Sequence, residues 1–180
     1  MTSMHTRLKV MKRSKGKNSL KCAAYRHAQP FRDSKTGEVF RNHTHQDVVH
    51  SEISIPENAP QWAQELKDMN PHKASEKLWN AVERIEKRKD AQVCREYEFA
   101  IPHELNEQQR IDFVRDFIQE NITSRGMIAD WAIHNHYDKK DQIEKPHVHI
   151  GLTMRPAFDP LTFENEKVYS YGDKIGRAHV

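Results

Sequence analysis

The segment from Pro146 to Met154 constrains the fold more than any other part of the sequence, because its residues alternate with the two-residue period of a β-strand. One face of this predicted strand is apolar and requires a core; it consists of Val148, Ile150, Leu152 and Met154. The opposite face carries His147 and His149, side by side and close enough to bind one metal ion. The sequence therefore predicts a strand that joins a core to a metal site.

A second predicted strand, Met127 to His134, ends just before a charged loop that runs from His136 to Lys145. Two strands joined in this way most simply form an antiparallel pair. His134 would then lie near the histidine pair and complete a three-histidine site with open positions for substrate oxygens. His136 shares a face with His134 and is the alternative third ligand.

The predicted strand Ala91 to Ile101 also separates by face, with Tyr97 and Phe99 on one side and Glu96 and Glu98 on the other. Two carboxylates opposite a core are common on a solvated sheet face. Beside a histidine site, a carboxylate can instead accept the second ring N–H of a ligating histidine and fix its tautomer. Both interpretations remain open from the pattern alone.

The rest of the chain mixes strands and helices. We expect one strand over 5–12, with Leu8 and Val10 pointing inward, and another over 48–55. Between them, residues 31–41 are expected to form a short hairpin that turns at residues 35–37. Helices are expected from residue 19 to about 28, over 59–69, over 75–89, and after an Asn106 cap, where Ile111, Val114, Phe117 and Ile118 form one apolar stripe. The predicted class is α+β, with a single mainly antiparallel sheet and helices packed largely on one face.

The net charge of +3 conceals a strong asymmetry along the chain. Residues 1–41 carry 11 Lys/Arg and 2 Asp/Glu, a balance of +9, whereas the remainder has a balance of −6. A basic N-terminal quarter beside a metal site indicates a polyanionic substrate, with nucleic acid as the first choice. The expected contacts are Lys12, Arg13, Lys15, Lys17, Lys21 and Arg26; the alternative is a solvated basic face without a partner.

Composition limits the class further. No apolar run approaches the roughly 20 residues of a membrane helix, and the N-terminus has no signal-peptide pattern. Cys22 and Cys94 show no metal-type spacing and are expected to be reduced thiols. We therefore expect a cytoplasmic protein without membrane insertion.

Tyr25 lies in the first predicted helix, away from the apolar-leaning stripe of Leu20, Ala23, Ala24 and His27. A tyrosine most often packs its ring against neighbours. As a nucleophile its phenol, with an ordinary pKa of about 10, would need activation. A metal ion that holds a target phosphate would help, because it makes phosphorus more electrophilic.

Six segments together resemble the MobA/MobL-type (MobQ) conjugative relaxases, which are DNA nickases of the HUH endonuclease superfamily. They appear in family order and are residues 18–26, 48–60, 78–83, 88–92, 95–102 and 146–150. Each segment alone is a weak signal, but the ordered set spans nearly all of the chain to Arg155.

The resemblance implies an HUH relaxase-like fold and a chemistry. Such relaxases bind one strand of plasmid DNA at an origin of transfer, and a tyrosine attacks a phosphodiester to leave a 5′-phosphotyrosyl link. By position, Tyr25 matches the nucleophile, and His134, His147 and His149 match the ligands of a divalent ion, Mg or Mn. Glu96 matches the supporting acidic residue. Accessory mobilisation proteins and a transfer-channel coupling protein are the further partners that the resemblance implies.

Other families with an H-x-H strand fit less well. A histidine-triad nucleotide hydrolase needs a third alternating histidine, but position 151 is Gly, and the 31 residues after His149 are too few for a barrel metallohydrolase. A rolling-circle replication initiator remains an alternative, with Tyr169 or Tyr171 as its tyrosine, as does a non-catalytic single-stranded DNA-binding module. The second H-x-H, His43 to His45, has no apolar opposite face and is interpreted as surface.

The sequence also predicts where the domain ends. Residues 1–174 are expected to form one nickase domain. Residues 175–180 look foreign and are expected to be a non-native tail, with a natural C-terminal region missing.

Overall fold

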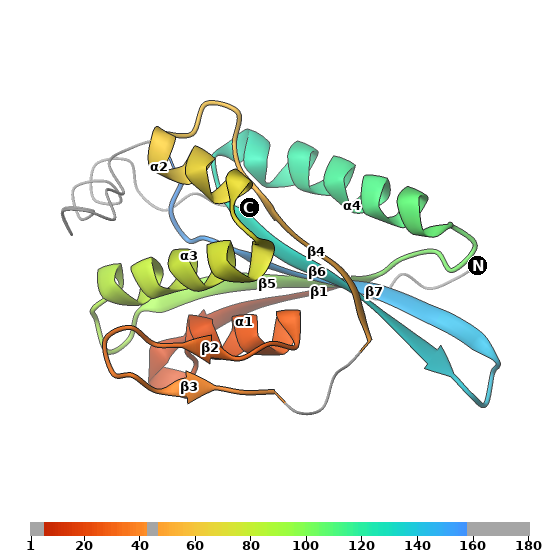
Figure 1. The fold of residues 1–180 in the computed structure, drawn as a ribbon, viewed down its shortest axis with the longest axis horizontal. Coiled ribbons are helices and arrows are strands. Elements are labelled where there is room, and N and C mark those ends of the chain that lie inside the picture. Colours follow the sequence, from red (N-terminus) through yellow and green to blue (C-terminus); the bar gives the residue numbers. More distant parts are fainter. Residues whose placement is uncertain (1–5, 43–46, 158–180) are drawn as a thin grey trace.

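The structure is a computed structural model that describes residues 6–42 and 47–157 (Figure 1). The second H-x-H, the two late tyrosines and residues 175–180 lie outside the described residues. The strands are β1 (Thr6–Lys12), β2 (Phe31–Arg32), β3 (Val39–Phe40), β4 (Val48–Ser54), β5 (Gln92–Ala100), β6 (Ala129–Asp138) and β7 (Ile143–Leu152). The α-helices are α1 (Ser19–His27), α2 (Gln61–Gln64), α3 (Pro71–Ile85) and α4 (Glu107–Asn121), and the short 3-10 helices are η1 (Arg13–Lys15), η2 (Glu65–Asp68) and η3 (Thr123–Arg125).

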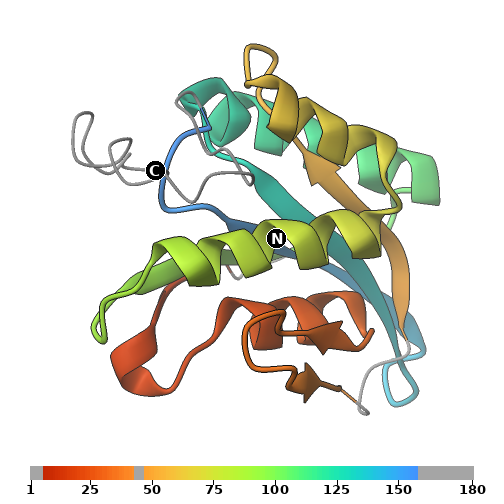
Figure 2. The same cartoon turned by 60° about the vertical axis from the view of Figure 1, so that its left-hand side comes forward.

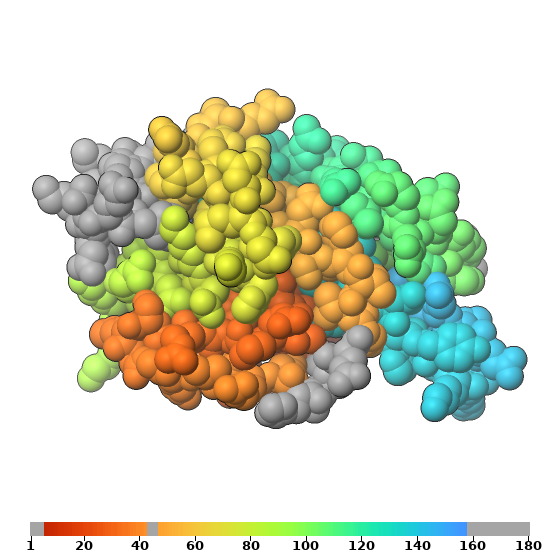
Figure 3. All heavy atoms as spheres, in the orientation of Figure 1, coloured from red at the N-terminus to blue at the C-terminus, as the bar shows by residue number. Residues whose placement is uncertain are grey.

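Five strands form one antiparallel sheet in the order β1-β5-β7-β6-β4, and β2 and β3 form a separate small hairpin. The predicted α+β class with a mainly antiparallel sheet is confirmed. The β6–β7 hairpin occupies the interior of the sheet, and its tip projects beyond the rest of the molecule (Figures 1 and 3).

Helices cover both faces of the sheet (Figure 2). On one face, α1 and α3 pack over a core that includes Leu20, Leu78 and Trp79. On the other face, α4 packs with Val114 and Ile118 against the apolar side of β6 and β7. Two of the three longer helices therefore share a face, and it is the face that carries the histidines.

Local sequence signals explain most helix ends. Asn18 caps α1 by accepting hydrogen bonds from the backbone N–H groups of Leu20 and Lys21, and Asn106 forms a capping box with Gln109 at the start of α4. The helix expected over 75–89 begins four residues earlier, because Asn70 caps it and Pro71 occupies its first turn. The helix expected over 59–69 is only the short α2 followed by a 3-10 turn.

One expectation about the core is wrong. Leu8 and Val10 were expected to point inward, but their exposed fractions are 46% and 39%. The reason is that β1 is the edge strand, and the aromatic side chains of α4 reach only as far as Tyr97 and Phe99 on β5. Met11 is the buried apolar residue of β1.

Within the described residues, none of the helices combines the length and the apolar character needed to cross a membrane.

Candidate active site

His134, His147 and His149 meet on one face of the sheet, where β6 pairs with β7. His134 is the register partner of His147 across the β6–β7 pair, and His149 lies two residues further along β7. One ring nitrogen from each of the three lies within 4.8 Å of the others. His134 and His149 are buried and His147 is partly buried. The alternation of the two strands thus places three imidazoles around one point.

Hydrogen bonds to backbone carbonyls orient two of these rings. The Nε2 atom of His134 lies 2.7 Å from the carbonyl oxygen of Arg26, and Nδ1 of His147 lies 3.1 Å from that of Lys145. A carbonyl only accepts, so these nitrogens carry the protons, and the other nitrogen of each ring carries the lone pair that a metal ion requires. This donor set and its outer hydrogen bonds fit a divalent transition-metal ion.

His136, the alternative third ligand, does not join this cluster. Its side chain is 63% exposed, and its Nδ1 lies 3.8 Å from Oδ2 of Asp47. Within the described part of the chain, His134, His147 and His149 are the group whose geometry could hold a metal ion.

Tyr25 lies against the histidine cluster. Its ring centroid is 5.4 Å from that of His149, edge to face, and 6.1 Å from that of His134. Burial raises the pKa of the Tyr25 phenol, and the carboxylates of Glu98, Glu96 and Asp47 raise it further. The phenol is therefore protonated at neutral pH, and a positive charge beside it would favour the phenolate.

The two carboxylates of β5 differ in their neighbours. Glu98 is the register partner of His149, whereas Glu96 pairs with Gly151 and its Oε1 lies 4.0 Å from Nη2 of Arg26. Both were expected on the histidine face and lie there. Glu98, which the resemblance did not single out, is the one opposite a histidine of the cluster.

A buried ionic network fastens α1 to the sheet beneath the cluster, and the sequence reasoning missed it. The Asp130 carboxylate on β6 accepts hydrogen bonds from Arg26 Nη1 at 2.7 Å, His27 Nε2 at 2.6 Å, Ser75 Oγ at 2.6 Å and Trp79 Nε1 at 2.7 Å. Burial alone would raise the pKa of Asp130, but His27, Arg26 and Ser75 outweigh that effect and hold it well below its ordinary value. The residue is therefore an anion that ties α1, α3 and β6 together.

Comparison with known proteins places this arrangement in a family. The MobA/MobL family model matches residues 17–179. The chain belongs to the MobA/MobL family. A conjugal transfer protein TraA of Rhizobium radiobacter is 34% identical over 174 residues, which cover 96% of this chain and 15% of that protein.

Two further relatives match parts of the chain. The 43 kDa relaxation protein of Salmonella typhimurium is 38% identical over 109 residues, covering 61% of this chain and 26% of that protein. The mobilization protein MobL of Acidithiobacillus ferridurans is 31% identical over 134 residues, which cover 74% of this chain and 32% of that protein. The chain therefore spans only a small part of the length of these relatives.

A solved structure has the same fold. It is described as "Molecular Basis of Vancomycin Resistance Transfer in Staphylococcus aureus", and it superposes with a TM-score of 0.71 at 28% identity, covering 90% of this chain and 78% of that one.

The basic residues of this MobA/MobL chain divide into exposed and structural ones. Lys15, Lys17 and Lys21 are exposed, and Lys12 is partly buried. Arg13 donates to Glu83 at 2.6 Å and to the carbonyl oxygen of Glu86. Arg26 was expected to contact nucleic acid, but its side chain is fully buried and bound to Asp130, so that expectation is corrected.

Proposed function

We propose that this chain is a mobilisation relaxase that nicks one strand of origin-of-transfer DNA, with Tyr25 as the nucleophile and with a divalent metal ion, Mg or Mn, as cofactor. One observation carries the proposal: the Tyr25 ring lies 5.4 Å from the ring of His149, beside a cluster of three histidines. The proposed nucleophile and the proposed metal site, which would hold the phosphate, are thus adjacent on one face.

The role of each residue follows from its place. The Tyr25 oxygen would attack phosphorus while the bond to the 3′-oxygen breaks, which leaves a 5′-phosphotyrosyl link and a free 3′-hydroxyl. One phosphate ester bond replaces another, so the strand can later be rejoined. His134, His147 and His149 would hold the cation, which when bound neutralises charge on the non-bridging oxygens of the phosphate.

Glu96 supports the site through Arg26 in this proposal. Its carboxylate lies 4.0 Å from the guanidinium of Arg26, whose backbone carbonyl accepts the hydrogen bond from His134. Arg26 therefore acts inside the protein as the residue that fixes both the nucleophile's helix and a ligand ring.

Substitution of the tyrosine tests the proposal. Tyr25→Phe removes only a partly buried hydroxyl, so the fold and the binding of single-stranded origin DNA should persist while the covalent protein–DNA adduct disappears from a denaturing gel. Tyr137→Phe is the matched control, because Tyr137 is 53% exposed on the projecting hairpin. An adduct formed by Tyr25→Phe would contradict the assignment and direct attention to Tyr169 and Tyr171.

Two alternatives make different predictions in the same assay. A rolling-circle replication initiator that uses one of the late tyrosines would keep its adduct in Tyr25→Phe. A non-catalytic binding module would bind the strand but form no adduct even as the wild type. The family match and the names of the relatives favour the relaxase.

The biological setting belongs to the same proposal. The relatives are named for conjugal transfer, relaxation and mobilisation. We place the chain in the bacterial cytoplasm, where it would act on plasmid DNA with accessory mobilisation proteins and a coupling protein of the transfer channel.

A further inference from the structure

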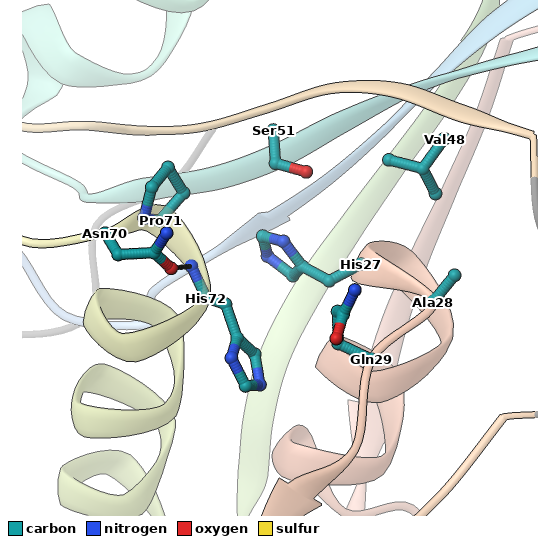
Figure 4. A pocket seen from close by; sticks show the side chains of 8 residues that line it. All are labelled: His27, Ala28, Gln29, Val48, Ser51, Asn70, Pro71 and His72. Atoms are coloured by element: carbon teal, nitrogen blue, oxygen red, sulfur yellow. Dashed lines mark hydrogen bonds between the residues drawn. The ribbon is translucent and has the colours of Figure 1, made fainter.

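A cavity of about 580 Å³ opens between the end of α1, the start of α3 and the strand β4 (Figure 4). Its volume is within the range of small-molecule sites, roughly 300–1,000 Å³. It is lined by His27 at the end of α1, Gln29 just after that helix, Val48 and Ser51 of β4, and His72 of α3. The residues proposed for the nicking step do not include any of these five side chains.

Two lining residues connect the cavity to the proposed site. The backbone N–H of Ala28, after α1, donates a hydrogen bond to the carbonyl oxygen of Tyr25, and Val48 is the register partner of His134 across the β4–β6 pair. A DNA strand bound with its scissile phosphate at the histidine cluster would therefore place a neighbouring nucleotide at this cavity.

A β-bulge shapes the wall that β4 contributes. The register between β4 and β6 shifts between Val48 and His50, so that Val48 pairs with His134 and Ser51 pairs with Ala132. Residues three apart on a regular strand point to opposite faces, but the extra residue of the bulge turns both toward the histidine-bearing face. Figure 4 shows the two side chains on the same side of β4, facing the cavity.

Two planar rings of the wall are held in place by the protein. His27 Nε2 donates a hydrogen bond of 2.6 Å to Oδ1 of Asp130, and His72 Nε2 lies 2.8 Å from the carbonyl oxygen of Pro30. The ring of His72 also packs edge to face against Phe31, with centroids 4.8 Å apart. His27 is buried, so the partly exposed ring of His72 is the one that a flat ligand can reach. A ring that is already ordered can receive such a ligand without a large further loss of side-chain entropy.

The chemistry of the walls favours a base over a phosphate. Among the lining residues that the structure describes there is no lysine or arginine, the usual partners of a phosphate. There is the imidazole ring of His72 for stacking, the amide of Gln29 and the hydroxyl of Ser51 for hydrogen bonds to a base edge, and Val48 for apolar contact. This combination is typical of sites that read unstacked bases in single strands.

We propose that this cavity is a subsite for one nucleobase of the single strand, the base of a nucleotide adjoining the phosphate that is cut. The inference rests on the proposed function, because it requires the strand to pass the histidine cluster. It adds a source of sequence preference that lies outside the residues of the nicking step.

The test scans single-stranded origin DNA of the parent element with one abasic nucleotide at each position around the nick. For the wild type, an abasic nucleotide at one position beside the nick should lower nicking by roughly tenfold at subsaturating protein, because the stacking of that base is lost. Ser51→Phe, which fills the cavity, should lower nicking of intact DNA by a similar factor. An abasic nucleotide at the sensitive position should then have no further effect in Ser51→Phe.

Two further variants control the scan. Gln29→Ala removes an amide from an exposed residue after α1, so it leaves folding intact and should reduce the same positional effect even if Ser51→Phe misfolds. Gln119→Ala, on the exposed side of α4, should behave as the wild type at every position. Equal sensitivity to abasic nucleotides at all positions, or an undiminished effect at the sensitive position in both Ser51→Phe and Gln29→Ala, would overturn the subsite.

The scan is repeated as strand binding, by fluorescence anisotropy in excess chelator. If the wild type fails to nick intact DNA with any divalent ion, the proposed function fails, while a position-specific loss of binding that the cavity variants remove would still support the subsite. Intact nicking without any such position would refute the subsite alone.

Discussion

The guanidinium of Arg26 and the carboxylate of Asp130 form a fully buried ion pair, with Nη1 and Oδ2 2.7 Å apart. Arg26 follows Tyr25 in the chain, and its carbonyl oxygen accepts the hydrogen bond from His134. The pair therefore fixes the helix of the proposed nucleophile relative to the strand that carries a proposed metal ligand. Sub-ångström placement of reacting groups strongly affects rate, so this pair links stability to the proposed chemistry.

Asp130→Asn should destabilise the protein by about 3–5 kcal/mol, because it leaves the buried Arg26 charge with only the more distant carboxylate of Glu96, 4.0 Å away. Urea unfolding followed by circular dichroism measures the change. Asp112→Asn is the matched control, since Asp112 is 56% exposed and lies 3.6 Å from Arg115; its effect should stay below about 1 kcal/mol. Equal effects of the two substitutions would contradict the role assigned to Asp130.

The same variant has a pH signature. The pKa of Asp130 is lower in the folded chain than in the unfolded chain, so its contribution to stability is complete above the unfolded value of about 3.9 and is lost as the pH falls below it. The gap in stability between wild type and Asp130→Asn should therefore be constant near neutrality and shrink below about pH 4. A gap that stays constant in acid would show that the carboxylate charge is not what stabilises the fold.

Gly151 provides the space that the Arg26 side chain occupies. A Cβ atom at residue 151 would lie 2.2 Å from Nη2 and 2.5 Å from Cζ of Arg26, whose guanidinium is held by Asp130 and cannot move aside without breaking that pair. Gly151→Ala should therefore cost about 1–3 kcal/mol, the range for overpacking a core.

A double-mutant cycle with Arg26→Lys tests the cause of that cost. If the clash is with the guanidinium, the two effects should differ from additivity by more than about 0.5 kcal/mol, because the residues are in contact. Additive effects would place the strain elsewhere on β7.

The sequence predicts the parts of the site that depend on strand alternation and local capping. The two-residue period of residues 146–154 correctly placed His147 and His149 on one face, and the hairpin loop correctly brought His134 to them. The Asn106 cap also lies where the pattern indicated. These features need only local geometry and the pairing of adjacent strands.

Long-range packing explains what the sequence did not predict. A basic residue in a basic segment was expected to face solvent, but Arg26 is buried because Asp130, 104 residues later, neutralises it. A signal did exist: Asp130 is the single charged residue in the apolar run Met127 to His134, and a carboxylate inside a buried strand requires a partner. The bulge at Val48 to His50, which shapes the cavity, had no such signal.

The histidine cluster should bind one divalent ion per chain. His134→Ala, His147→Ala and His149→Ala should each abolish or strongly weaken binding of Mn²⁺ measured by titration calorimetry, because a two-imidazole site holds the ion poorly. Chelation should stop nicking by the wild type, and added Mn²⁺ or Mg²⁺ should restore it.

His136→Ala is the matched control for the metal measurement, since its side chain is exposed and directed at Asp47. It should bind the ion as the wild type does, and His43→Ala and His45→Ala should also leave ion binding nearly unchanged. Loss of the ion in His136→Ala with retention in His134→Ala would reverse the assignment of the third ligand.

Exposed lysines in and just before the first helix should supply part of the affinity for DNA. Lys21 is four residues before Tyr25, so both side chains lie on the same side of α1, and Lys21 is exposed. Lys21→Ala should weaken binding of any single strand and reduce the slope of log K against log salt by about 0.7 if one phosphate contact is lost. Lys17→Ala and Lys15→Ala, further from Tyr25, should have smaller effects of the same kind.

Arg88→Ala is the control for the salt measurement, because Arg88 is 78% exposed but pairs with Asp90 at 2.9 Å beyond the end of α3. Its salt slope should equal that of the wild type. An unchanged slope in Lys21→Ala would mean that the strand does not follow the exposed side of α1.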